Sequence, residues 1–216
     1  MSEQKSMGLW QNIRANALNL SAMAIVAAAA LAIIYVATKS LISENQRMAQ
    51  IAALTEVMPS EYFDQELLQH SFALPNAQQL EQSKESLGYA AWRDGELTGW
   101  IFPVTSINGY SGPIYILVGM DAQGAITGVR ITGHKETPGL GDKIDYQKSK
   151  WVDDFIGATL TSHKWAVTKE GGDFDQFTGA TVTPRAVITA VESSLVYLQQ
   201  NQDALLAAAS ASKEGQ

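Results

Sequence analysis

A threonine that follows a glycine–alanine pair offers the clearest chemistry in this sequence. The two small residues before Thr181 leave its hydroxyl open to close approach. Thr183 and Pro184 follow, a pattern typical of a helix start with threonine as N-cap and proline in the first helical position. Free N–H groups at a helix N-terminus favour a phosphate, and Arg185 in the first turn could pair with it. The segment therefore indicates a phosphoester site, with an ordinary capped turn between strand and helix as the alternative.

A second segment, Glu136 to Gly141, is rich in glycine and suited to bring backbone N–H groups close to a bound group. The alternative is a surface turn set by Pro138. Tyr110 and Trp151 are candidates to stack on a planar ligand, although aromatic side chains serve equally well in a core.

The composition excludes several kinds of site. The 216 residues contain no cysteine and three well-separated histidines, so thiolate-bound clusters, disulfides and a histidine-rich metal centre are not expected. Asp and Glu outnumber Lys and Arg by 22 to 15, whereas a nucleic-acid surface needs clustered positive charge, so no nucleic-acid partner is predicted. No base is evidently placed to activate Thr181 as a hydrolytic nucleophile, and we predict no catalytic residue and no metal ligand.

An uncharged stretch near the N-terminus predicts a membrane anchor. Residues 15–38 carry no charge over 24 positions and, as a helix, would extend about 36 Å, more than the roughly 30 Å of a bilayer core. We expect a short arm over 1–14 and a single transmembrane helix over 15–38. A cleaved signal peptide is the alternative, but its apolar region is typically only about 7–15 residues long. Basic residues flank both ends, so charge does not determine the orientation.

The remaining pattern predicts an α+β fold, an antiparallel sheet with packed helices. We expect a helical or irregular connector over 39–86, a folded domain over 87–205 and a flexible tail over 206–216. The domain begins as an antiparallel meander, with strand patterns near 89–92, 97–104, 114–120 and 125–132 separated by glycine-containing turns. A short helix is expected near 144–156 and strand-like residues at 165–168. A long amphipathic helix should follow, beginning with Thr183 as its N-cap.

The segment from Asp175 to Thr181 resembles the flavinylation motif Asp-x-x-(Ser/Thr)-Gly-Ala-Thr, whose last threonine carries FMN through a phosphoester bond. With Glu136 to Gly141 as a second characteristic loop, nearly the whole chain is similar to the FMN-binding G subunit of the Rnf ion-translocating electron transport complex. The C subunit of the sodium-translocating NADH:quinone reductase shares both motifs and is the alternative family. The compact length and the continuous motifs favour the Rnf family.

The resemblance implies covalent FMN on Thr181, with the phosphate at the N-terminus of the last helix near Thr183 and Arg185. Thr183 is also the nearest alternative hydroxyl, weakened as a candidate by its expected capping role. A separate flavin transferase, using FAD and a divalent metal, would recognise four neighbouring residues: Asp175, Thr178, Gly179 and Ala180. The residues expected to border the isoalloxazine ring come from the second loop and are Glu136, Thr137, Gly139, Leu140 and Gly141.

The resemblance thus implies a membrane-anchored electron carrier in a complex that couples electron transfer to ion translocation. Its partners would be the other subunits, the lipid bilayer and, during maturation, the flavin transferase. The family places the span in the bacterial inner membrane and the domain in the periplasm. A protein of this kind is not expected to turn over a substrate alone, because the flavin supplies the redox chemistry. The competing hypothesis of another class is a tethered extracytoplasmic binding module without a cofactor.

Overall fold

The computed structural model describes residues 3–64 and 67–214. It divides into two units, a helical one up to Ala49 and a compact one from Gln50 onward. In the described part of the chain, one helix is long and apolar enough to cross a membrane, the stretch Asn16–Val57 of helix α1 (Glu3–Val57). Its apolar side chains, such as those of Leu31 and Val36, are exposed, as expected for a surface that contacts lipid. The long apolar helix is confirmed, but the limits 15–38 stay a prediction because α1 is helical well beyond both.

The compact unit is built on one antiparallel sheet. Within the described residues the sheet has five strands in the order β1-β2-β3-β4-β5. Their bounds are β1 (Ser71–Ala73), β2 (Leu87–Arg93), β3 (Glu96–Ser106), β4 (Ile114–Asp121) and β5 (Ile126–Gly133). Asp94 and Gly95 join β2 to β3 with positive φ angles of 51° and 84°, as a tight hairpin turn requires. The predicted meander and the α+β class are confirmed, and β1 is an additional strand.

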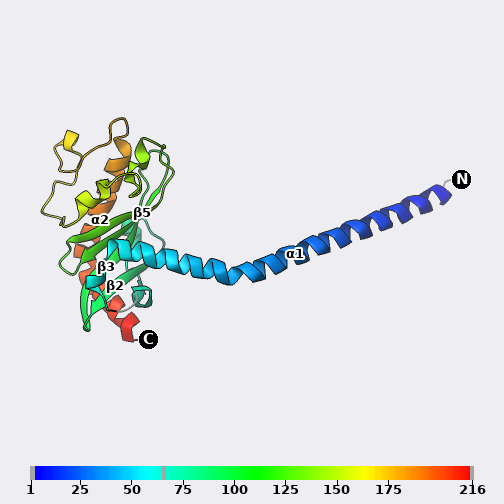
Figure 1. Ribbon diagram of the computed structural model, residues 1–216, viewed down its shortest axis with the longest axis horizontal. Coiled ribbons are helices and arrows are strands. Elements are labelled where there is room, and N and C mark those ends of the chain that lie inside the picture. The colour runs from blue at the N-terminus through cyan, green and yellow to red at the C-terminus, as the bar shows by residue number, and fades with distance from the viewer. Residues whose placement is uncertain (1–2, 65–66, 215–216) are drawn as a thin grey trace. The chain divides into compact units, whose positions relative to one another are not determined.

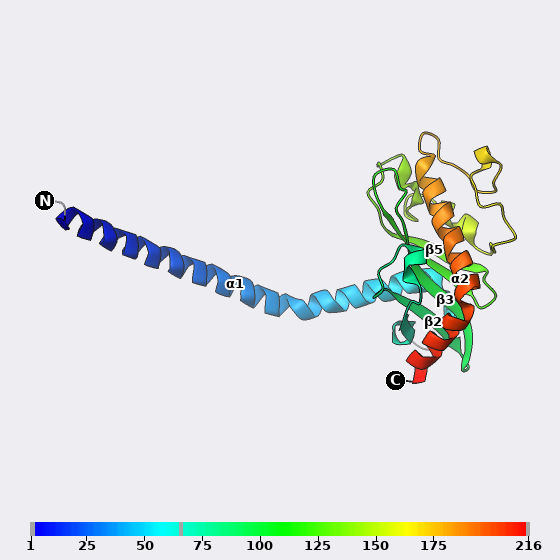
Figure 2. The ribbon, with the colours of Figure 1, turned by 180° about the vertical axis from the view of Figure 1, so that it is seen from behind.

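Helix α2 (Val182–Glu214) covers one face of the sheet, as Figures 1 and 2 show. Side chains alternate along the strands, so Ala90, Trp100 and Phe102 face a core shared with α2, whereas Tyr89 and Ile101 face the other side. That other side is covered by the end of α1, whose Leu54 and Val57 are almost fully buried there. The sheet is therefore enclosed between two helical layers.

The end of α1 approaches the sheet backbone directly. Thr127 donates its hydroxyl proton to the carbonyl oxygen of Val57 at 2.6 Å. A Cβ added to Gly119 would lie 2.2 Å from that same oxygen, and one added to Gly128 would lie 2.7 Å from the Val57 Cα, so glycine is needed at both. The predicted connector over 39–86 thus differs from the structure: from Gln50 it is part of the compact unit, because its apolar residues are buried on the sheet.

Two local predictions were wrong in detail. The helix expected near 144–156 is instead two short 3-10 helices, Gly141–Ile144 and Trp151–Phe155. The strand-like residues 165–168 contribute a single bridge, between Val167 and Phe174. The aromatic residues of both segments pack together: Trp151 contacts Phe155, and Trp165 contacts Phe155 and Phe174.

Helix α2 also differs from its expected limits. It begins at Val182, so Thr183 lies inside the first turn and is not the N-cap. Pro184 is tolerated there because the first N–H groups of a helix have no intrahelical acceptor. At the other end, α2 runs to Glu214 through the residues expected to form a tail, since Leu205 and Ala209 are buried against the domain.

Candidate functional site

The two segments of chemical interest meet at a cavity of about 310 Å³ beside the first turn of α2. Such a volume lies at the lower end of the roughly 300–1,000 Å³ typical of small-ligand sites. Three stretches that are far apart in sequence supply the lining, which comprises Tyr110, the loop residues Glu136, Thr137, Leu140 and Gly141, and the residues Gly179 to Thr183. In Figure 2 the loops that follow β5 gather around the beginning of α2. The tertiary structure therefore joins both sequence motifs into one site.

Glycine makes this close meeting possible. Gly139 and Gly179 have φ angles of 77° and 83°, in the left-handed region that other residues rarely adopt. At Gly141 the constraint is steric, because a Cβ would lie 2.8 Å from the Thr183 hydroxyl oxygen and 3.0 Å from the Glu136 Cβ. The second loop can thus lie directly against the first turn of α2.

Glu136 is a buried carboxylate at the centre of the site. Its side chain lines the cavity, yet the residue is only 4% exposed. Oε1 accepts the backbone N–H of Ser111 at 3.0 Å, and Oε2 accepts the hydroxyl proton of Thr183 at 2.5 Å. Since these donors belong to the turn after β3 and to α2, one carboxylate connects three walls of the cavity.

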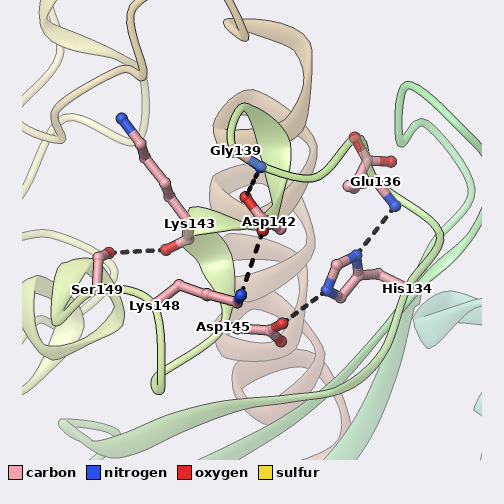
Figure 3. A network of polar contacts seen from close by, with 8 residues as sticks. All are labelled: His134, Glu136, Gly139, Asp142, Lys143, Asp145, Lys148 and Ser149. Carbon is pink, nitrogen blue, oxygen red and sulfur yellow. Dashed lines mark hydrogen bonds and ion pairs between the residues drawn. The ribbon is translucent and has the colours of Figure 1, made fainter.

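The loop behind Glu136 is held by further polar contacts, which Figure 3 shows. The backbone N–H of Glu136 donates to His134 Nδ1 at 3.0 Å. This leaves the ring proton on Nε2, which lies 3.0 Å from Asp145 Oδ2 and donates to it. Farther along, the N–H of Gly139 donates to the buried Asp142 Oδ1 at 2.8 Å. These contacts fix the path of the backbone along the cavity.

Thr181 directly precedes α2 and is half-buried at the cavity. The free N–H groups and the positive dipole end of the first helical turn favour an anion at this point. Apolar side chains stand exposed around the same opening: Tyr110 is 72% exposed, Leu140 43% and Val182 38%. A hydroxyl, an anion-favouring helix end and an exposed apolar rim together fit a phosphorylated planar group such as FMN.

Other predicted residues lie outside the cavity lining. Asp175 is exposed, and its carbonyl oxygen accepts the indole N–H of Trp151 at 2.8 Å. Trp151 itself is buried among aromatic rings, so it belongs to the core and does not stack on a ligand in the cavity. Thr178 is exposed on the surface. Arg185 forms an ion pair with Glu170.

An acidic surface accompanies the aspartate of the motif. The pKa of Asp154 is raised, chiefly by partial burial and then by the negative charges of Asp175 and Asp153. The Asp175 carboxylate of the motif therefore acts electrostatically on Asp154.

Sequence reasoning missed two contributors to the site. Val182 lines the cavity, but an isolated valine carries no chemical signal. His134 was not among the predicted site residues, and the structure gives it a positioning contact with Glu136. Their separation of two positions along the chain was the available signal, because a side chain at that spacing can accept a backbone N–H.

Comparison with known families defines the class of protein. Residues 109–196 match the family model of the FMN-binding domain, and they include β4, β5 and every residue of the cavity lining. Residues 1–57 match the RnfG N-terminal region, which corresponds to the long apolar helix. The protein is therefore an FMN-binding domain preceded by a candidate membrane-spanning helix.

Whole-chain relatives identify the family. The G subunit of the ion-translocating oxidoreductase complex from Aliivibrio fischeri (strain MJ11) is 41% identical over 197 residues, covering 90% of this chain and 94% of the relative. The proteins of the same name from Pseudoalteromonas atlantica and Pseudomonas aeruginosa are each 42% identical, over 92% and 89% of this chain and 94% and 91% of their own lengths. The chain belongs to the family of G subunits of ion-translocating oxidoreductase complexes, which confirms the resemblance to the Rnf protein.

Proposed function

We propose that this chain is a membrane-anchored electron-carrier subunit that holds FMN covalently on Thr181. The complex to which it belongs would couple electron transfer to ion translocation. The observation that carries the proposal is the convergence of Thr181, the first turn of α2 and the 136–141 loop on one cavity within the FMN-binding domain. The similar proteins are named as subunits of ion-translocating oxidoreductase complexes, so other subunits of such a complex are the expected partners.

Attachment requires a flavin transferase, FAD and a divalent metal. The Thr181 hydroxyl oxygen forms a bond to the phosphorus of the FMN half of FAD, and the P–O bond of the pyrophosphate breaks. AMP leaves, the hydroxyl proton is released and no electrons are transferred. The partial exposure of Thr181 supports this assignment, because an acceptor hydroxyl must reach the active site of a second protein. Asp175 and Thr178 lie exposed in the same segment, where a transferase could contact them.

The protein's own residues would hold and orient the flavin. Bound FMN supplies the ability to take up and release electrons. The first N–H groups of α2 would stabilise the phosphate, and Tyr110, Leu140 and Val182 would contact the apolar ring system. Gly139 lies outside the cavity lining, whereas Gly141 lets the loop backbone lie directly against the first turn of α2.

Attachment is tested by expressing the full chain together with a flavin transferase. We expect flavin fluorescence of the denatured protein in a gel and an intact mass raised by that of FMN less water. Thr181→Ala should abolish both signals. Thr189→Ala, which removes an exposed hydroxyl on the same helix outside the cavity lining, should keep them and is the matched control. Unmodified wild-type protein from a host with an active transferase would refute the proposal, and flavin on Thr181→Ala would place the attachment elsewhere.

We further propose that the chain crosses the bacterial inner membrane once and places its FMN domain in the periplasm. Covalent attachment supports this location, because a dissociated flavin would be lost from that compartment. The chain has no cysteine, so a single one introduced at the exposed Glu85 gives a clean reporter. A membrane-impermeant maleimide should label Glu85→Cys in cells whose inner membrane is intact. Labelling only after that membrane is broken would place the domain in the cytoplasm.

A further inference from the structure

Thr181 and Thr183 both line the cavity, but the structure gives their hydroxyls different surroundings. Thr181 is half-buried and stands just before α2. Thr183 is only 1% exposed, and its hydroxyl proton is directed to Glu136 Oε2 at 2.5 Å. Two chemically equivalent hydroxyls are thereby made unequal.

The Glu136 carboxylate that receives this proton has little freedom to move. Its other oxygen, Oε1, accepts the Ser111 N–H at 3.0 Å, and the backbone N–H of Glu136 donates to His134 Nδ1. The backbones of two glycines pack closely against the carboxylate, one on each side. A Cβ at Gly109 would lie 2.9 Å from Oε1, and one at Gly141 would lie 3.0 Å from Oε2. The carboxylate is thus a fixed acceptor built into the wall of the cavity.

From this arrangement we propose that Glu136 is a positioning residue that selects Thr181 as the flavin acceptor. The inference rests on the proposed attachment of FMN to Thr181. By holding Thr183, Glu136 fixes the first turn of α2 against the 136–141 loop and so sets the position of Thr181 at the opening. It also keeps the competing hydroxyl inside the fold, since Thr183 is only 1% exposed while it donates to Glu136 Oε2.

The hydrogen bond is tested by the rate of flavin attachment. The detergent-solubilised full chain is incubated with FAD, Mg²⁺ and a transferase that modifies the wild type, and intact mass is followed over time. Thr183→Val keeps the shape of the side chain but removes the hydroxyl, and should slow attachment by about tenfold or more, as expected when an acceptor is misplaced. Thr183→Ser keeps the hydroxyl and should react within about twofold of the wild type. This pair separates the hydrogen bond from simple filling of the space.

Variants at Glu136 provide the second arm. Glu136→Ala removes the acceptor and should slow attachment to Thr181 about as much as Thr183→Val. Peptide mapping should then detect flavin on Thr183, whereas the wild type carries it on Thr181 alone. Glu136→Gln keeps the volume and can donate to Thr183 while accepting from Ser111, so it replaces Glu136→Ala if that variant does not fold. Glu136→Gln should also release the Thr183 proton and slow attachment.

The outcomes distinguish this inference from the proposed function. Wild-type protein that takes up no flavin would refute the proposed function itself. If the wild type is modified on Thr181 while Thr183→Val and the folded Glu136 variant react within about twofold of it, the positioning role of Glu136 is refuted. A loss of rate in Thr183→Ser equal to that in Thr183→Val would also overturn it, because the hydroxyl would then be irrelevant.

Discussion

The hydrogen bond between Thr183 and Glu136 makes a quantitative prediction about stability that does not depend on flavin. Thr183→Val replaces a hydroxyl by a methyl group of similar size and leaves Glu136 Oε2 without that donor. Both residues are buried, at 1% and 4% exposure, so solvent cannot readily replace the lost contact. The substitution should therefore destabilise the folded domain.

The size of the effect follows from the kind of bond that is lost. A hydrogen bond to a charged group contributes about 1.5–3 kcal/mol, and a buried acceptor left unsatisfied adds to the cost of losing it. We therefore expect Thr183→Val to lower the free energy of unfolding by about 2–3 kcal/mol. For a domain of this size, each kcal/mol shifts Tm by about 2–4 °C, which gives a fall of about 4–12 °C.

Urea and thermal unfolding of the detergent-solubilised full chain, followed by tryptophan fluorescence, measure this change. Thr189→Val is the matched control, because Thr189 lies exposed on the same helix and the chemical change is identical. It should alter stability by less than about 0.5 kcal/mol. Thr183→Val and Thr189→Val of equal stability would refute the reasoning, since the buried hydroxyl would then contribute nothing that an exposed one does not.

Three further substitutions test other parts of the structure. Gly119→Ala should lower the free energy of unfolding in urea by about 1–3 kcal/mol, because the added Cβ forces the end of α1 away from the sheet. Gly133→Ala is the control and should lower it less, because a Cβ there meets only a tyrosine ring at 3.3 Å. Equal losses of stability would contradict the backbone contact at Gly119. Burial raises the pKa of Tyr197 to about 12, so the folded state retains a phenolic proton that the unfolded chain loses near pH 10. The stability that this group contributes is fully present below about pH 10 and is lost as the pH rises toward 12. Urea unfolding across this pH range should therefore show a smaller fall in the free energy of unfolding for Tyr197→Phe than for the wild type. An equal fall in both proteins would exclude Tyr197 as its source. Trp151→Phe removes the indole donor to the Asp175 carbonyl and should lower the free energy of unfolding in urea by about 1 kcal/mol. It should also lower flavin attachment in a gel assay. Unchanged attachment would show that this contact does not support the motif.

The strands of the sheet were predictable because their signals are local. Alternating apolar residues and glycine-containing turns predicted β2 to β5, and the observed antiparallel ladder follows that order. β1 has only three residues, too few to show a period, and pairs with β2 through contacts that only the folded chain brings together. The docking of α1 against the sheet was missed for a similar reason: Gly119 and Gly128 do not indicate in the sequence which backbone will approach them.

In the candidate site too, features with a local sequence signal were predictable and features that depend on distant contacts were not. The threonine after the glycine–alanine pair and the glycine-rich loop were recognisable from residue types and spacing alone. The expected capping role of Thr183 was wrong because its hydroxyl is bound by Glu136, 47 residues earlier in the chain. Arg185 was expected near the phosphate from its place in the first turn, but Glu170 on the surface engages its guanidinium.

The sequence by itself determined the apolar N-terminal helix, the meander, the final helix and the two motifs, because each depends on neighbouring residues and their periodicity. Tertiary structure alone decided that these motifs share one cavity and that a buried carboxylate connects its walls. It also made Thr181 and Thr183 unequal, because burial and hydrogen bonding depend on which distant segments pack together. A local pattern can identify a reactive hydroxyl, but only the folded chain determines which hydroxyl is held by a partner and which stands open.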